Sequence, residues 1–191
     1  MRGEHKVCEQ MATRARDNRR GHRVMNRVQA AVGSAVFFVL APGTIVGYLP
    51  WLLTGWQVGD PLPGWLPLRV LGVLLLLAGL GAILHAFIRF VVEGWGTPAP
   101  VAAPRHLVVG GLYSHVRNPI YVSLLVAITG EALLLGQLWL LLYAGAVGLF
   151  LSLWVLFIEE PALREQFGEE YETYRRAVPG WWPRLRPWKA G

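Results

Sequence analysis

An apolar stretch from Ile120 to Ile158, which contains no charge except Glu131, constrains this chain most strongly. As one helix, at about 1.5 Å per residue, it would extend roughly 58 Å, close to twice the roughly 30 Å hydrocarbon core of a bilayer. We therefore expect two antiparallel spans that turn near Gly136 and Gln137. Such a hairpin returns Glu159 to the membrane face at which the stretch begins.

The composition indicates an integral membrane protein. Of the 191 residues, 54% are hydrophobic and 16% are charged, against about 25% charged residues in ordinary soluble domains. Two further apolar blocks precede the long stretch, and neither shows the alternation of barrel strands. The expected fold class is all-α integral membrane, with about four transmembrane helices at about residues 28–53, 70–92, 119–136 and 138–158.

Lysine and arginine are distributed unevenly. Eight precede residue 28, none lies in residues 54–68, and most others lie in residues 93–118 or after Glu160. Because positively charged loops stay inside, both termini and both ends of the hairpin are predicted to be cytoplasmic, in a multi-pass protein of the bacterial cytoplasmic membrane.

Residues 1–27 are expected to form a basic, flexible cytoplasmic tail that touches anionic headgroups, ahead of one membrane domain, residues 28–191. No nucleic-acid partner is expected, because no folded reading module accompanies the charge. The first apolar block is too long for a cleaved signal peptide and is interpreted as a retained anchor. Cys8 is the only cysteine, so an intramolecular disulfide and a multi-cysteine metal site are excluded, and no metal is expected.

Prolines and tryptophans mark the first half of the membrane domain. Pro42 and Pro50 are expected to kink or end the first span, and the proline-rich residues 61–67 are expected to be non-helical. Three tryptophans are typical of an outer aromatic belt: Trp51, Trp56 and Trp65.

Polar residues inside or beside the spans leave alternatives open. His85 and Arg89 share a helix face near the cytoplasmic end, where Arg89 either snorkels to the headgroups or lines a polar cavity with His85. Glu131 is either a functional intramembrane carboxylate or a group at the outer interface. The connector of residues 93–118, with Tyr113 and His115, is long enough to fold over a ligand.

A polar cluster, Arg117-Asn118-Pro119-Ile120-Tyr121, begins the hairpin. Asn118 is a favourable N-cap and Pro119 a favourable first helical residue, so the pair predicts a helix start. The free amides of such a start suit an anion. Arg117 would anchor that anion, or it is an ordinary inside-flanking arginine.

A second cluster, Glu159-Glu160-Pro161, ends the hairpin. Two carboxylates at the negative end of a helix dipole are unfavourable, so a positive group is expected beside them. Pro161 is expected to break the span and start an amphipathic interfacial helix, about residues 161–177, that roofs a pocket. Its apolar positions are Leu163, Phe167, Tyr171, Tyr174 and Val178, with Trp181, Trp182 and Trp188 as interfacial anchors.

These residues carry a resemblance. Residues 111–121 (GLYSHVRNPIY), followed by Glu159-Glu160-Pro161, Phe167-Gly168 and Val178-Pro179, resemble the isoprenylcysteine carboxyl methyltransferase and phospholipid methyltransferase group of integral membrane enzymes. The similarity covers about residues 94–183.

The resemblance implies an S-adenosylmethionine-dependent methyltransferase whose lipophilic acceptor arrives from the bilayer. In this group an Arg-His-Pro-x-Tyr or Asn-Pro-x-Tyr motif and a glutamate pair help to bind the cofactor. Asn118 stands where the carboxyl methyltransferases commonly have histidine. The phospholipid branch has asparagine before the proline, as this chain does. The implied cofactor-binding residues are Tyr113, His115, Arg117, Asn118, Pro119, Tyr121, Glu159 and Glu160, and the implied catalytic residues are Glu159, Glu160 and Arg117.

The charges of these residues are compatible with that cofactor. The two glutamates match its sulfonium and ammonium, and Arg117 with the helix-start amides matches its carboxylate. A carboxylate acceptor needs no base, whereas an ammonium acceptor must first lose a proton, which a glutamate would take. A non-catalytic multi-span protein and a sterol-reductase-like NADPH oxidoreductase remain as alternatives. The acceptor and the oligomeric state stay open.

Overall fold

The computed structural model describes residue 36, residues 40–94 and residues 106–189. All regular structure in these ranges is helical, which confirms the all-α class for this part of the chain. The elements are η1 (Gly43–Tyr48), α3 (Leu49–Thr54), α4 (Leu66–Gly94), η2 (Gly111–Ser114), α5 (Pro119–Leu135), α6 (Trp139–Trp154), η3 (Val155–Glu159), α7 (Glu160–Phe167) and α8 (Glu169–Ala177). The predicted basic tail and residues 95–105 lie outside the described residues.

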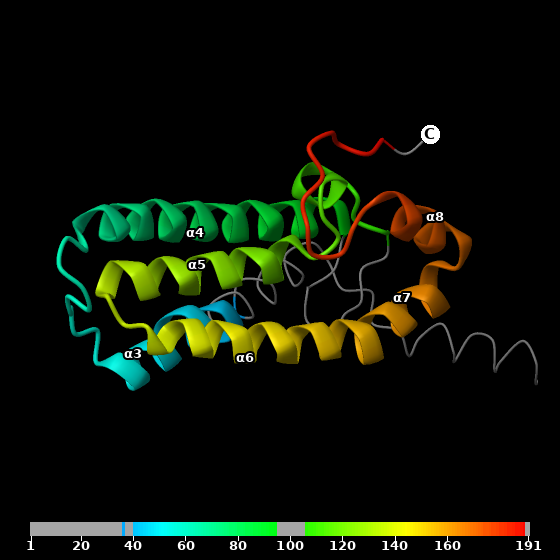
Figure 1. Ribbon diagram of the computed structural model, residues 1–191. Coiled ribbons are helices and arrows are strands. Elements are labelled where there is room, and N and C mark those ends of the chain that lie inside the picture. The colour runs from blue at the N-terminus through cyan, green and yellow to red at the C-terminus, as the bar shows by residue number, and fades with distance from the viewer. Residues whose placement is uncertain (1–35, 37–39, 95–105, 190–191) are drawn as a thin grey trace, which may run out of the picture.

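Helices α4, α5 and α6 lie side by side, with α5 in the middle (Figure 1). The α5–α6 turn falls at the position predicted from the sequence. Gly136 follows α5 with a φ of 66°, and α6 begins at Trp139. Glycine suits this turn because the conformation is left-handed and because a Cβ at Gly136 would overlap the carbonyl group of Gly59.

Small residues allow α4 and α5 to approach closely. A Cβ at Gly79 would lie 2.8 Å from the backbone nitrogen of Ala127, and one at Gly130 would lie 2.5 Å from the backbone nitrogen of Leu76. Ala127 and Ile128 are completely buried in this contact. Such backbone approach strengthens van der Waals packing between helices in lipid, where hydrophobic burial contributes little.

The loop before α4 and the first turn of α4 satisfy carbonyl groups at the end of α5. The Trp65 indole donates to the carbonyl of Leu133, and Arg69 Nε donates to that of Leu134, over 2.9 and 3.1 Å. Arg69 also pairs with Asp60 at 2.9 Å. Helix ends need such partners, because their last carbonyls have none within the helix.

This loop corrects two expectations. Trp65 is only 6% exposed, so it holds the loop against α5 and does not join an aromatic belt. Trp51 and Trp56 are exposed. The helix α4 already includes Pro67. A proline is tolerated there because an amide in the first turn would have no intrahelical partner.

The first described helix continues through both of its prolines. Between Pro42 and Pro50 it widens into the π-helix η1, and α3 then runs to Thr54. A π turn changes the hydrogen-bond spacing around a proline, so the helix does not end there. The hydroxyl of Tyr143 in α6 donates to the carbonyl of Ile45 over 2.9 Å, which fastens this helix to the hairpin.

The C-terminal helices differ from the expected single helix of residues 161–177. Helix α6 passes through η3 into α7 without a break at Pro161, which lies in the first turn of α7. The break falls at Gly168, with a φ of 52°, and α8 follows. The apolar positions predicted for this segment do meet, but in a cluster with Trp188 and the chain near Val109.

Two helical stretches in the described ranges are long and apolar enough to cross a bilayer. They are Leu66–Arg89 and Trp139–Phe167, with mean hydropathies of 2.4 and 2.3. Two other apolar helices, Leu40–Thr54 and Pro119–Leu135, are shorter.

Candidate functional site

The hairpin brings the two polar clusters together. Arg117, just before α5, places Nη1 2.8 Å from Oε1 of Glu160, which begins α7. Both side chains are largely buried, with 14% and 10% of their surfaces exposed. The positive group expected beside the glutamate pair is therefore present.

Glu160 is held by more than one arginine. Its Oε2 lies 3.2 Å from Arg175 Nε and 3.5 Å from Arg164 Nη2. Glu172 also contacts both of these arginines. This network ties α7 to α8 around Glu160, which makes Glu160 an anchor of the site's architecture.

Tyr171 in α8 completes the surroundings of Arg117. Arg117 Nη1 donates a hydrogen bond to the Tyr171 hydroxyl over 3.0 Å. Burial raises the pKa of Tyr171 above its ordinary value, although the Arg117 charge lowers it. Tyr171 therefore stays neutral and can accept this hydrogen bond.

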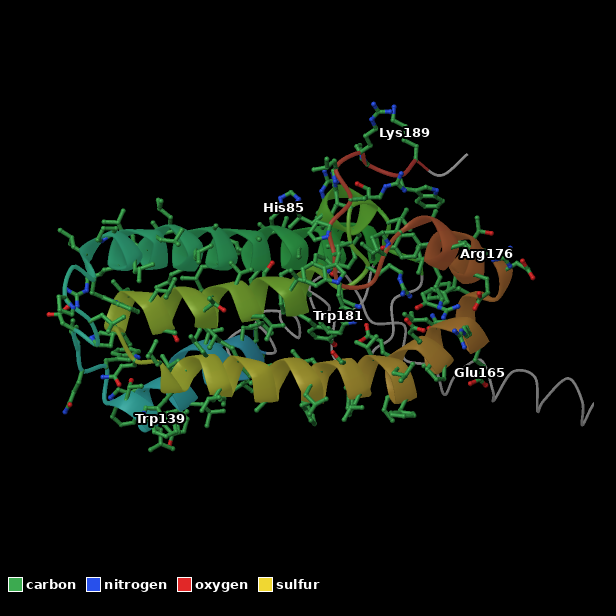
Figure 2. All side chains as sticks on the ribbon, viewed as in Figure 1. His85, Trp139, Glu165, Arg176, Trp181 and Lys189 are labelled. Atoms are coloured by element: carbon green, nitrogen blue, oxygen red, sulfur yellow. The ribbon has the colours of Figure 1, made fainter. Side chains whose placement is uncertain are left out.

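Glu159 has a different environment from its neighbour. The Tyr121 hydroxyl donates to Glu159 Oε2 over 2.9 Å. Among the described residues Glu159 forms no ion pair, in contrast to Glu160. Tyr121 also stacks on Trp181, with ring centroids 6.5 Å apart, and Trp181 lies between α5 and α6 (Figure 2). The Glu159 carboxylate is thus the less compensated of the two.

The chain after α8 folds back over residues 114–118. The amides of Arg117 and Asn118 donate to the carbonyls of Pro179 and Gly180, and the amide of Arg184 donates to the carbonyl of His115. This segment crosses the start of α5 (Figure 1). The sequence patterns did not reveal this contact, because it pairs two irregular segments that have no periodicity.

Asn118 occupies the expected N-cap position without its expected hydrogen bond. Its side chain does not cap α5. Instead its Nδ2 donates to the Gly180 carbonyl over 3.1 Å. Pro119 is the first residue of α5, as predicted, and is buried. Asn118 therefore fixes the C-terminal segment rather than the helix start.

Tyr113 and His115 also contact the C-terminal part of the chain. The buried Tyr113 accepts a hydrogen bond at its carbonyl from the Tyr174 hydroxyl over 2.7 Å. His115 Nδ1 lies 2.8 Å from the carbonyl of Arg184. Both residues lie in the neighbourhood of Arg117, but these contacts are structural.

Arg117 has a hydrogen-bond donor without a partner in the described ranges and a small space beside its guanidinium. Arg117 Nε is buried and has no hydrogen-bond partner among the described residues. A Cβ on Gly180 would lie 3.1 Å from Arg117 Nη2. Glycine at this position therefore keeps space beside the guanidinium.

The remaining intramembrane candidates lie elsewhere. His85 is exposed and points away from α5 (Figure 2). It and Arg89 lie against Gly111, where a Cβ would be 2.8 Å from His85 Nε2 and 3.1 Å from Arg89 Nε. Glu131 is only 8% exposed within the helix packing, and its Oε2 has no partner among the described residues.

Sequence comparison assigns the chain to a family. A profile of the phospholipid methyltransferase family matches residues 68–170, which is more than half of the 191 residues. The chain belongs to the phospholipid methyltransferase family. The matched range contains α5, α6 and both polar clusters. With its apolar helices, this membership makes the chain a membrane protein of a methyltransferase family.

The chain is also similar in sequence to a characterised methyltransferase. Over 78 residues the chain is 36% identical to the protein-S-isoprenylcysteine O-methyltransferase of Schizosaccharomyces pombe. The match covers 38% of this chain and 31% of that relative, so the chain spans about a third of the relative's length.

Proposed function

We propose that this protein transfers a methyl group from S-adenosylmethionine to a lipophilic acceptor at the membrane surface. One observation carries the proposal: the hairpin gathers Arg117, Glu159 and Glu160 at one end of the bundle, within the range matched by the family. The set offers a cationic donor and a weakly compensated carboxylate from distant parts of the sequence.

The residues fit the charges of the proposed cofactor. Glu159, which has one neutral hydrogen-bond donor and no ion pair among the described residues, suits an ammonium or a sulfonium. Arg117 Nε, a buried donor without a partner in those ranges, suits a carboxylate. Glu160 and Tyr171 hold the guanidinium in position. We assign Asn118, His115 and Tyr113 to the wall around this site, from their contacts with the C-terminal segment and with α8. We assign Pro119 to the same wall because it is buried and begins α5 beside them.

S-adenosylmethionine, when bound by Arg117 and Glu159, would supply a methyl group on a positively charged sulfur. Its transfer would form a bond from the acceptor atom to that carbon and break the carbon–sulfur bond, whose electron pair would stay on sulfur. The protein contributes alignment and exclusion of water. Tyr121 orients the Glu159 carboxylate through its hydrogen bond. A carboxylate acceptor needs no base, whereas an ammonium acceptor would give a proton to Glu159.

The proposed arrangement in the membrane has four spans, with the shorter helices Leu40–Thr54 and Pro119–Leu135 beside the two longer ones. Both termini then face the cytoplasm, as the lysine and arginine distribution favours. Residues 1–27 are the basic tail, and residues 28–191 form the catalytic membrane domain. Helices α7 and α8 lie at the interface and roof the site, and the membrane would be bacterial and cytoplasmic.

Titration of the purified full chain with S-adenosylhomocysteine and with NADPH tests this function. The proposal expects saturable binding of S-adenosylhomocysteine and none of NADPH. Binding of NADPH alone would favour a reductase, and binding of neither would favour a non-catalytic membrane protein. Incubation of membranes with methyl-labelled cofactor would then identify the labelled acceptor, and a base-labile label would indicate a methyl ester.

A further inference from the structure

The C-terminal segment, residues 178–189, is basic. It contains Arg184, Arg186 and Lys189 and no acid. Arg186 and Lys189 are exposed and form no ion pair among the described residues. Arg184 Nη1 donates to the neutral carbonyl of Ala177 over 2.7 Å. The positive charge of this segment is therefore not neutralised within the described part of the chain.

Large apolar side chains project from the same segment. Leu185, between two arginines, is 98% exposed, and Trp182 is 83% exposed. Exposed apolar side chains gain nothing from water, and where they gather they mark contact sites for membranes or proteins. Tryptophan, leucine and basic residues together are typical of segments that lie in a membrane interface.

Backbone contacts hold this segment beside the end of α4. The amide of Trp188 donates to the carbonyl of Ser114, the last residue of η2, over 2.9 Å. Gly111, the first residue of η2, lies against His85 and Arg89 of α4. Figure 2 shows His85 and Lys189 on the same side of α4, the side that faces away from α5.

This side of α4 suits a phospholipid. The apolar stretch that is long enough to cross a bilayer ends at Arg89, and Leu84 and Ile88 are exposed near that end. Acyl chains along these two residues would place their headgroups at the level of His85, whose imidazole N–H can donate to a phosphate oxygen. No acid lies between residues 66 and 92 of α4 to repel a phosphate.

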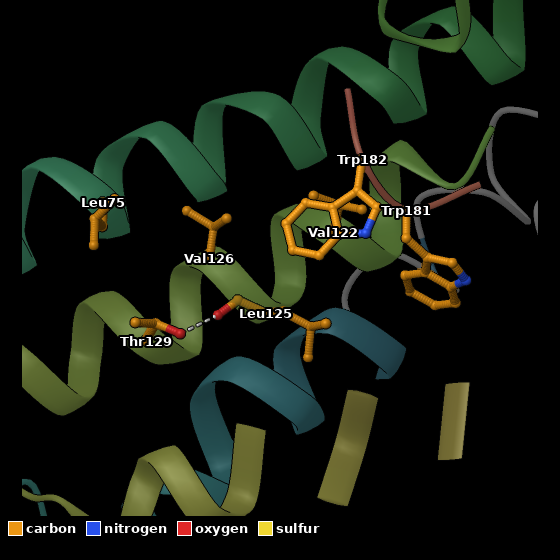
Figure 3. A pocket seen from close by; sticks show the side chains of 7 residues that line it. All are labelled: Leu75, Val122, Leu125, Val126, Thr129, Trp181 and Trp182. Carbon is orange, nitrogen blue, oxygen red and sulfur yellow. Dashed lines mark hydrogen bonds between the residues drawn. The ribbon is translucent and has the colours of Figure 1, made fainter. Parts of the chain in front are cut away.

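The other end of the segment is fixed on α5. Trp181 stacks on Tyr121, with ring centroids 6.5 Å apart, and the rings of Trp181 and Trp182 border an apolar pocket along α5 (Figure 3). The amides of Arg117 and Asn118 donate to carbonyls at residues 179 and 180. The segment is therefore held at both ends, so its cations are positioned without a partner.

We propose that residues 182–189, together with His85, bind the headgroups of anionic phospholipids in the leaflet at this end of the bundle. Arg186 and Lys189 attract the phosphate, and Leu185 enters the interface between the lipids. Each lysine or arginine near a membrane surface favours anionic lipid by about fivefold. The trimethylammonium group of a zwitterionic phosphatidylcholine opposes the same cations, so lipids with a net negative charge are preferred.

Native mass spectrometry of the purified full chain tests this preference. The protein is mixed with equal amounts of dioleoyl phosphatidylglycerol and dioleoyl phosphatidylcholine, and the ratio of the two retained lipids is measured. Wild type should retain phosphatidylglycerol preferentially. The double variant Arg186→Gln, Lys189→Gln should reduce that preference at least about fivefold. Residues 1–27 are present in every sample, so the difference reports residues 186 and 189.

A matched variant separates this surface from net charge. Arg176→Gln removes one charge from an exposed position on α8, apart from His85 and Lys189 (Figure 2). Arg186→Gln should reduce the preference for phosphatidylglycerol about threefold, and Arg176→Gln should leave it unchanged. Equal effects of these two variants, or a wild-type preference in the double variant, would overturn the proposal.

A spin label at residue 185 tests whether the partner is a membrane. Leu185→Cys in a Cys8→Ser background carries a nitroxide, in nanodiscs of dioleoyl phosphatidylglycerol. Oxygen should relax this label more than a water-soluble nickel chelate does, and Arg176→Cys in the same background should show the opposite. Equal access of the chelate to both labels would favour an acidic protein partner and refute the lipid.

Inorganic phosphate distinguishes a lipid headgroup from a free anion. Sodium phosphate is added to the labelled nanodiscs and compared with sodium chloride at equal ionic strength, because salt alone screens surface charges. The accessibility of the label at residue 185 should be the same in both salts. Release of the label into water by phosphate alone would assign the surface to free phosphate and reject the lipid.

Discussion

The Arg117 guanidinium and the Glu160 carboxylate lie 2.8 Å apart, although 43 positions separate them in the sequence. The helices α5, α6 and η3 account for most of that separation. The ion pair therefore depends on the hairpin, since it forms only if the chain leaves this end of the bundle and returns to it.

A double-mutant cycle at this pair should detect coupling. Arg117→Met should lower the free energy of unfolding by about 2 kcal/mol, less than for an isolated buried pair because Arg175 and Arg164 still face Glu160. Combined with Glu160→Gln, the loss should be about 1–2 kcal/mol smaller than the sum of the single losses. Reversible unfolding in detergent, followed by near-ultraviolet circular dichroism, measures both. Strict additivity would show that the two side chains do not interact.

Gly180→Ala should disturb the site without touching either glutamate. The added Cβ would lie 3.1 Å from Arg117 Nη2, so the guanidinium must shift by a few tenths of an ångström. Affinity for S-adenosylhomocysteine should fall by about threefold to tenfold, because recognition depends on placement of the donor. Gly145→Ala is the matched control, since a Cβ there meets nothing within 4 Å. If both variants bind like wild type, Arg117 is not at the cofactor site.

Gly79→Ala tests the close contact of α4 with α5. A Cβ there would come 2.8 Å from the Ala127 nitrogen, so overpacking should reduce stability by about 1–3 kcal/mol. Gly81→Ala on the same helix meets nothing within 4 Å and should be neutral or stabilising. Thermal unfolding of the two variants, compared with wild type, provides the measurement. Equal midpoints would contradict this packing.

Cys8 provides a test of orientation, because it is the only cysteine in the chain. With the N-terminus in the cytoplasm, a membrane-impermeant maleimide should label Cys8 only after the cells are permeabilised. Asp60→Cys in a Cys8→Ser background should be labelled in intact cells, because the proposed topology places the loop between α3 and α4 outside. Asp60 is exposed in that loop, so the reagent can reach it. Labelling of Cys8 in intact cells would reverse the proposed topology.

Hydrophobic length and helix-end chemistry made the hairpin predictable. The apolar stretch was too long for one crossing, and Gly136 provides the left-handed residue that ends α5. The positive group beside the glutamates was also predictable, because buried acids at a helix end need compensation. These features are local or depend on length, so one sequence suffices to find them.

Other features depend on which irregular segments meet. The hydrogen bond from Asn118 to Gly180 joins two loops, and no periodic pattern marks it. Trp65 was predicted to join an interfacial aromatic belt because of its residue type and position, but its indole donates a hydrogen bond to the carbonyl of Leu133. Pro161 suggested a break, whereas the helix continues because the π-helical turn η3 directly before it changes the hydrogen-bond spacing around the proline. The break falls at Gly168.

Calorimetric titration of S-adenosylhomocysteine into Glu159→Gln tests the central claim most directly. The substitution removes the charge of the carboxylate that lacks an ion pair among the described residues. Affinity should fall at least about tenfold relative to wild type, which corresponds to 1.4 kcal/mol. Glu165→Gln, at an exposed acid on α7, should bind like wild type. Equal affinity of Glu159→Gln and wild type would contradict the proposed cofactor site.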